Sequence, residues 1–159
     1  MPDRIWAGEH FVNGVQEVGD QRRKALFAYS LTFGKAANLP RRNDFDTTEV
    51  RRLLAKIELQ DVVRDPIHLR YRLMGSDVIQ LRESNHTGQQ LHKIYQNFEQ
   101  SITYKRLATV VEEQITIWCI GRPTHQSRSA CRLRELLHLP FAADGESVDT
   151  LLTAVLVRR

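Results

Sequence analysis

The sequence predicts an α+β domain in which helices cover one face of an antiparallel sheet. Along residues 69–74, Leu69, Tyr71 and Leu73 alternate with Arg70, Arg72 and Met74, the period-two pattern of a strand with two unlike faces. The chain also predicts two helices, then a hairpin of two strands, then further helices and finally three strands, an order that suits an antiparallel sheet. Helices on one face of such a sheet leave room for a cavity between the two layers.

Length and composition are those of a single globular domain. The chain has 159 residues, of which 42% are hydrophobic and 26% are charged. We expect residues 1–19 to be an irregular extension and residues 20–159 to be one domain that includes its N-terminal helix. The net charge of +4 comes from short basic pairs scattered among acids, which argues against a nucleic acid as partner.

The first half of the domain predicts two helices and a hairpin. Residues 20–38 carry an apolar stripe of helical period after the capping residue Asp20, and a short helix follows Asp46, which begins a capping box. Residues 57–63 and 67–74 alternate as strands on either side of a turn at residues 65–66. So short a connection implies antiparallel pairing.

The second half predicts helices and then three strands. Gly75 ends the preceding strand, and Ser76 with Asp77 is expected to cap a short helix. Residues 89–114 predict one or two helices with a break near residue 100. The last three strands are expected within residues 115–120, 129–141 and 148–157, separated by glycine-containing or polar turns.

Eight short segments follow one another in a distinctive order: LPRR at 39–42, DFD at 44–46, LL at 53–54, DV at 61–62, LRYRLMG at 69–75, TG at 87–88, LHLPF at 137–141 and DG at 144–145. Together they resemble a bacterial PAS domain, and more narrowly a group of single-domain PAS-like proteins common in alphaproteobacteria. The resemblance extends over about residues 26–157. It implies a five-stranded antiparallel sheet with helices on one face, an internal pocket for a small ligand or cofactor, and signalling by association, often as a homodimer through N-terminal helices.

Three aromatic residues are candidates for such a pocket. Tyr71 lies on the strand face shared with Leu69, Tyr95 lies in the helical region, and Trp118 lies in a strand-like run. We predict that the three side chains line part of a ligand site. The alternative is that they simply pack in the core, as buried aromatic residues more often do.

The sequence identifies no cofactor and no metal site. His86 or His92 could serve as an axial haem ligand, but a single histidine without a supporting motif is a weak signal. Cys119 and Cys131 lie in strand-like segments, without the spacing of a zinc site and outside the helical region where a flavin-adduct cysteine is needed. We therefore expect buried free thiols.

No catalytic residues are predicted either. The chain has no nucleophile elbow, zincin, phosphate-loop or dinucleotide motif, and the adjacent acids at 112–113 point in different directions on a helix. Arg70 and Arg72 are interpreted as a solvent-facing strand surface with a cross-strand acid such as Glu58, and alternatively as an anion or partner contact.

The resulting hypothesis is a cytoplasmic PAS-like sensory or regulatory domain without catalytic output. It would bind a small ligand or a protein partner and signal through association, with residues 20–38 as the dimerisation helix. The alternatives are a ligand-free interaction module and a small enzyme with an unrecognised site. No signal peptide and no membrane-spanning stretch are expected.

Overall fold

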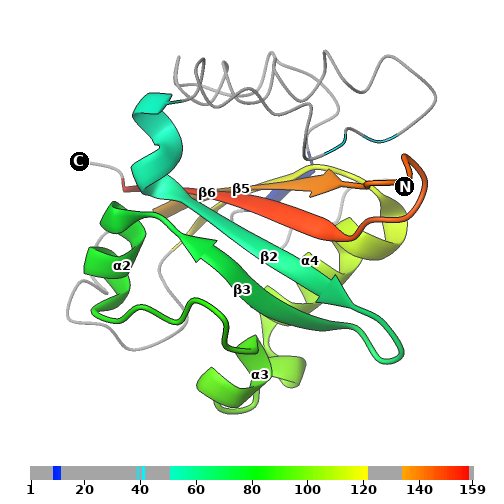
Figure 1. Cartoon of the computed structure of the whole chain (residues 1–159), viewed down its shortest axis with the longest axis horizontal. Coiled ribbons are helices and arrows are strands. Elements are labelled where there is room, and N and C mark those ends of the chain that lie inside the picture. Colours follow the sequence, from blue (N-terminus) through cyan, green and yellow to red (C-terminus); the bar gives the residue numbers. More distant parts are fainter. Residues whose placement is uncertain (1–8, 12–38, 40, 42–50, 122–133, 158–159) are drawn as a thin grey trace.

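The computed structural model describes residues 9–11, 39, 41, 51–121 and 134–157. These residues form an antiparallel sheet of six strands in the order β1-β4-β5-β6-β2-β3 (Figure 1). The strands are β1 Glu9–Phe11, β2 Ile57–Val63, β3 His68–Met74, β4 Ile117–Gly121, β5 Arg134–Phe141 and β6 Thr150–Val157. The five strands after β1 are those that the sequence predicts, so the predicted α+β class with a five-stranded antiparallel sheet is confirmed.

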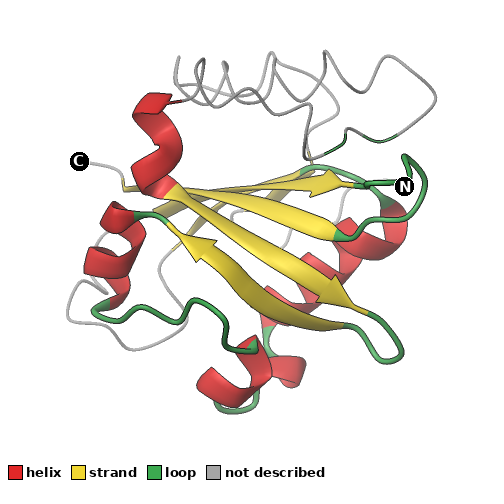
Figure 2. Ribbon diagram, in the orientation of Figure 1, coloured by secondary structure: helices red, strands yellow, loops and turns green. Residues whose placement is uncertain are grey.

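Helices lie on both sides of this sheet but mostly on one. Helices α2, α3 and α4 lie below the sheet in the view of Figure 2, and η3 lies above it. Their bounds are η3 Arg51–Lys56, α2 Ser76–Arg82, α3 Leu91–Ile94, η4 Phe98–Gln100 and α4 Ile102–Glu113. In the described part of the chain, no helix is long and apolar enough to span a bilayer.

Strand alternation divides the buried apolar residues into two clusters. The first, on the helix-covered face, includes Leu69, Tyr71, Met74, Val78, Leu91, Phe98, Leu107, Val110, Val111, Ile117, Val148, Leu151 and Val155. The second, on the face that contacts η3, includes Leu53, Ile57, Trp118, Leu137, Leu139, Phe141, Leu152 and Ala154. Both faces of β5 and β6 are buried, and most of the residues in these two strands are apolar.

The structure corrects four local predictions. Residues 9–11 form a strand paired with β4 rather than an irregular extension. Gly75, not Ser76 or Asp77, is the N-cap of α2, because Asp77 lies within the helix and pairs with Lys56 at 2.6 Å. Residues 115–116 precede β4 instead of starting it.

The fourth correction concerns Leu73. Its side chain is exposed rather than aligned with Tyr71, because a register shift between Leu59 and Gln60 interrupts the alternation of β3. The helix at 20–38 and the start of the strand at 129–141 were also predicted. Residues 12–38 and 122–133 lie outside the described part of the chain.

Candidate functional site

A row of polar side chains crosses the helix-covered face of the sheet. His138 on β5 lies opposite Thr153 on β6, and Thr153 lies opposite Glu58 on β2. Gln60, two residues along β2, lies on the same face as Glu58. We call Glu58, Gln60, His138 and Thr153 the polar row. Each member is no more than 2% exposed, so the row lies within the core.

A continuous hydrogen-bond chain links the members of the polar row. The Nδ1 atom of His138 lies 2.8 Å from the hydroxyl oxygen of Thr153. The Thr153 hydroxyl donates to Oε1 of Gln60 at 3.3 Å, and the Gln60 amide donates to Oε2 of Glu58 at 3.1 Å. The row therefore ends at a buried carboxylate.

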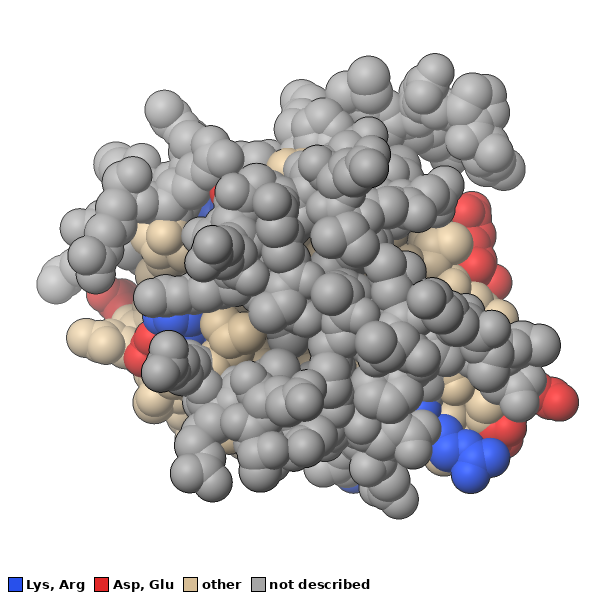
Figure 3. All heavy atoms as spheres, turned by 90° about the horizontal axis from the view of Figure 1, so that it is seen from above, with Lys and Arg blue, Asp and Glu red and all other residues tan. Residues whose placement is uncertain are grey.

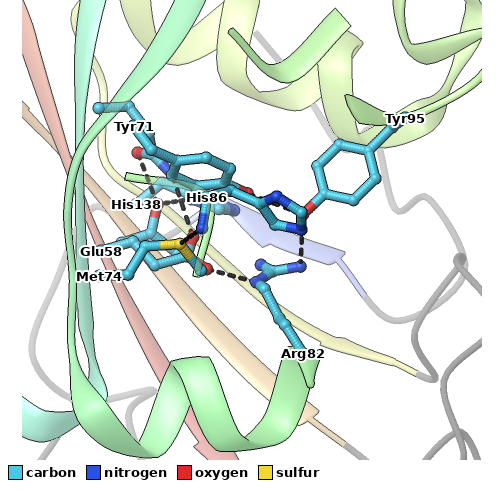
Figure 4. Close-up of polar contacts among 9 residues, drawn as sticks. Glu58, Tyr71, Met74, Arg82, His86, Tyr95 and His138 are labelled. Carbon is cyan, nitrogen blue, oxygen red and sulfur yellow. Dashed lines mark hydrogen bonds and ion pairs between the residues drawn. The ribbon is translucent and has the colours of Figure 1, made fainter. Parts of the chain in front are cut away.

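Arg82 at the end of α2 neutralises that carboxylate. Its Nε atom donates to Oε1 of Glu58 at 2.6 Å (Figure 4), and its Nη1 atom donates to the Tyr95 hydroxyl at 3.3 Å. The Tyr95 and Tyr71 hydroxyl oxygens are 3.1 Å apart. One guanidinium thus connects the sheet to the segment that follows α3.

Local backbone structure fixes these positions. Helix α2 ends at Glu83, which adopts a left-handed conformation with φ of 59°, so the chain turns away directly after Arg82. The connection that follows returns to β3, where the backbone N–H of Gly88 donates to the Tyr71 carbonyl and that of Tyr71 donates to the Gln89 carbonyl. The His86 N–H contacts the Met74 sulfur at 3.2 Å. These contacts attach the connection to the edge of the sheet.

Burial and charge set the protonation of the site. Burial lowers the pKa of His138 to about 3, and the positive charges of Arg106 and Arg82 act in the same direction. Burial, followed by the negative charge of Glu58, raises the pKa of Tyr71 well above its usual value. Burial lowers the pKa of Arg82, but the charge of Glu58, the two tyrosines Tyr71 and Tyr95 and the hydrogen bond to Glu58 together outweigh this effect, and the net pKa is raised. At neutral pH the site therefore holds a neutral imidazole, a neutral phenol and an ion pair.

Two of the three predicted ligand-binding residues belong to this site. Tyr71 and Tyr95 meet through their hydroxyl groups, whereas Trp118 packs in the apolar cluster on the opposite face of the sheet. Strand parity explains the difference, because Ile117 takes the helix-covered side of β4. Ligand contact by Tyr71, Tyr95 and Trp118 stays a prediction, and the three cannot line one common surface.

Sequence reasoning missed the polar row. The available signal was parity, since the members of the polar row share an inward face with apolar residues such as Val62, Leu136 and Leu151. Arg82 could not be found in this way, because a basic residue near a helix C-terminus is ordinary.

The charged partner expected for Arg70 and Arg72 was wrong. Both arginines pair with Asp61, at 3.2 and 2.6 Å, because Asp61 shares their side of the hairpin whereas Glu58 faces the interior. Both arginine side chains are nearly half exposed, as a solvent-facing strand surface predicts. On the face seen in Figure 3, the described acidic and basic side chains that are visible lie toward the periphery.

The other histidines whose side chains the structure describes do not assemble a metal site. His92 stacks on His68 with ring centroids 4.3 Å apart, and His86 meets Tyr95 edge-on. Among the described residues, no three histidine, cysteine or acidic side chains are placed to hold a metal ion. Cys119 is buried in β4, as predicted, and Cys131 lies outside the described residues.

The comparisons with known proteins identify one matching family. A family model described as "PAS domain" matches residues 19–156, which include β2 to β5, all of β6 but its last residue and all the residues of the candidate site. No curated protein matches the sequence.

Proposed function

Because the chain belongs to the PAS domain family, we propose that it is a sensory module that binds a small molecule between its sheet and helices α2–α4. The polar row supports this proposal. A core that served stability alone would be expected to place apolar side chains at Glu58, Gln60, His138 and Thr153, because buried polar groups are costly unless every one of them is bonded. Hydrogen-bonding groups on a concave interior are instead typical of a ligand site.

Signalling would proceed by a shift in conformational population. Arg82 joins Glu58 on the sheet to Tyr95 after α3, so a molecule that competes for any of these groups changes how the helical segment attaches to the sheet. The proposed output is contact with another protein, without a reaction catalysed by this chain, in the cytoplasm. Residues 20–38 remain the proposed dimerisation helix, on the strength of their apolar stripe.

One observation favours a second candidate, a ligand-free interaction module. Many side chains of the helix-covered cluster are almost completely buried against one another, including Tyr71, Leu107 and Leu151. A core filled in this way could serve only to present an outer surface to a partner.

Native mass spectrometry of the full chain purified from its own host, combined with multi-angle light scattering, tests the two candidates. The sensor proposal expects a bound small molecule that is lost on denaturation, and a dimer whose fraction changes when that molecule is removed. A ligand-free mass in every preparation, together with an unchanged dimer, would favour the interaction module. A monomer at micromolar concentration would overturn the proposed dimerisation through residues 20–38.

A further inference from the structure

One atom of the polar row is buried without a partner. In the part of the chain that the structure describes, Nε2 of His138 makes no hydrogen bond, although the residue is only 2% exposed. A buried polar atom of this kind costs free energy, and in native proteins it usually has a structural or functional explanation.

The hydrogen-bond chain determines whether Nε2 of His138 is a donor or an acceptor. The Glu58 carboxylate can only accept, so the amide nitrogen of Gln60 must face it and the amide oxygen must face Thr153. The Thr153 hydroxyl then donates its proton to Gln60, which leaves its oxygen to accept from His138. The proton of a neutral imidazole therefore lies on Nδ1, and Nε2 carries a free lone pair.

The positive charges around the ring further restrict its partner. The charges of Arg106 and Arg82 both disfavour a positively charged His138. A ligand that donated its hydrogen bond from an ammonium group would be repelled for the same reason. Tyr71, Met74 and the packed ring of Tyr95 supply flat and polarisable surfaces in the same cluster.

We propose that Nε2 of His138 accepts a hydrogen bond from the sensed molecule, and that this molecule presents an uncharged hydroxyl or ring N–H on a flat, largely apolar body. The inference rests on the proposed ligand-binding function and specifies the chemistry of its ligand.

The tautomer can be tested without any ligand. Long-range proton–nitrogen correlation spectra of the ¹⁵N-labelled full chain distinguish protonated from unprotonated ring nitrogens, and we expect His138 to carry its proton on Nδ1. In Glu58→Gln, the new amide should keep its oxygen toward Arg82 and turn its nitrogen toward Gln60. Gln60 must then reverse, Thr153 must donate to His138, and the proton should move to Nε2.

Phenol and toluene form a matched pair of binding probes, because they share a shape and differ in one hydroxyl donor. Titration followed by the same spectra should give phenol about tenfold tighter binding than toluene, together with a shift of the His138 Nε2 resonance. The ratio of the phenol affinity to the toluene affinity should approach one in His138→Leu and in Glu58→Gln. It should remain unchanged in the control His92→Leu, whose ring stacks on His68.

The outcomes separate this inference from the function on which it rests. A proton on Nε2 in the unmodified chain, or equal binding of the two probes, would overturn the donor proposal while leaving ligand binding intact. If neither probe binds and no small molecule copurifies, ligand binding itself fails and the inference fails with it. A haem absorption band that disappears in His138→Leu would also overturn it, because Nε2 would then be a metal ligand.

Discussion

At the scale of single residues, the neutral state of His138 makes stability depend on pH. The folded-state pKa of about 3 lies below the unfolded value of about 6.5, so the unfolded chain binds a proton that the folded chain excludes. Stability from this residue is complete above pH 6.5 and is lost as the pH falls toward 3. Between pH 7 and pH 5 the loss amounts to about 2 kcal/mol.

Urea denaturation at pH 7 and pH 5 measures this loss. Between pH 7 and pH 5, the free energy of unfolding of His138→Gln should fall by about 2 kcal/mol less than that of the unmodified chain. Other acid-sensitive groups cancel in this comparison, including Asp144, whose pKa is lowered by the backbone N–H groups of Ser147 and Glu146. Equal losses in the two proteins would show that His138 is not held neutral by the fold.

The buried ion pair gives a second prediction at this scale. Arg82→Met leaves the Glu58 carboxylate in the core without its cation, and should lower the free energy of unfolding by about 3 kcal/mol. Adding Glu58→Gln to this variant should recover part of the lost free energy of unfolding, because the unpaired buried carboxylate is then replaced by a neutral amide. Chemical denaturation measures both effects.

Arg72→Met is the matched control for Arg82→Met. The Arg72 side chain is 45% exposed and its guanidinium shares Asp61 with Arg70, so its removal should change the free energy of unfolding by no more than about 0.5 kcal/mol. Equal effects of the two substitutions would contradict a special role for the buried pair.

At the scale of elements, Gly75 joins β3 to α2 in a place with no room for a side chain. A Cβ at this position would lie about 2.5 Å from the Leu54 carbonyl oxygen and would also overlap the backbone of Ala55 in η3. We expect Gly75→Ala to cost about 3 kcal/mol, because η3 or α2 must move.

Gly88→Ala separates crowding from backbone conformation. Gly88 has a φ of 87°, but no atom lies within 4 Å of a Cβ built there, so its substitution should cost only about 1 kcal/mol. Thermal unfolding of the two variants makes the comparison. A larger cost at Gly88 would show that the Gly75 contact with η3 is easily relieved.

The helices and strands also show how much of the fold could be predicted from the sequence. Residues 57–63 and 68–74 alternate clearly and were predicted almost to the residue. Glu9–Phe11 could not be predicted, because three residues carry no periodicity and their strand exists only through pairing with β4. The polar row was hidden for a related reason, since its members lie on three strands and meet only when the sheet is assembled.

At the scale of the whole molecule, the strand order predicts which parts of the fold open last. β5 and β6 lie in the middle of the sheet with neighbours on both sides, whereas β1 and β3 form its edges. Hydrogen exchange followed by mass spectrometry should show the slowest amides in β5 and β6 and faster exchange in β3. Protection of β3 beyond that of β6 would contradict this order.

The directional chain from His138 to Glu58 has an evolutionary consequence. A mutation at position 58 that exchanges an acceptor for a donor would reverse every hydrogen bond up to the imidazole, two strands away. Under the proposed function, a single substitution at position 58 would therefore change His138 from an acceptor to a donor toward its ligand, and so change the class of ligand that binds, without replacing the histidine itself. Positions 58, 60, 82, 138 and 153 should accordingly change together among homologues, as a single heritable unit.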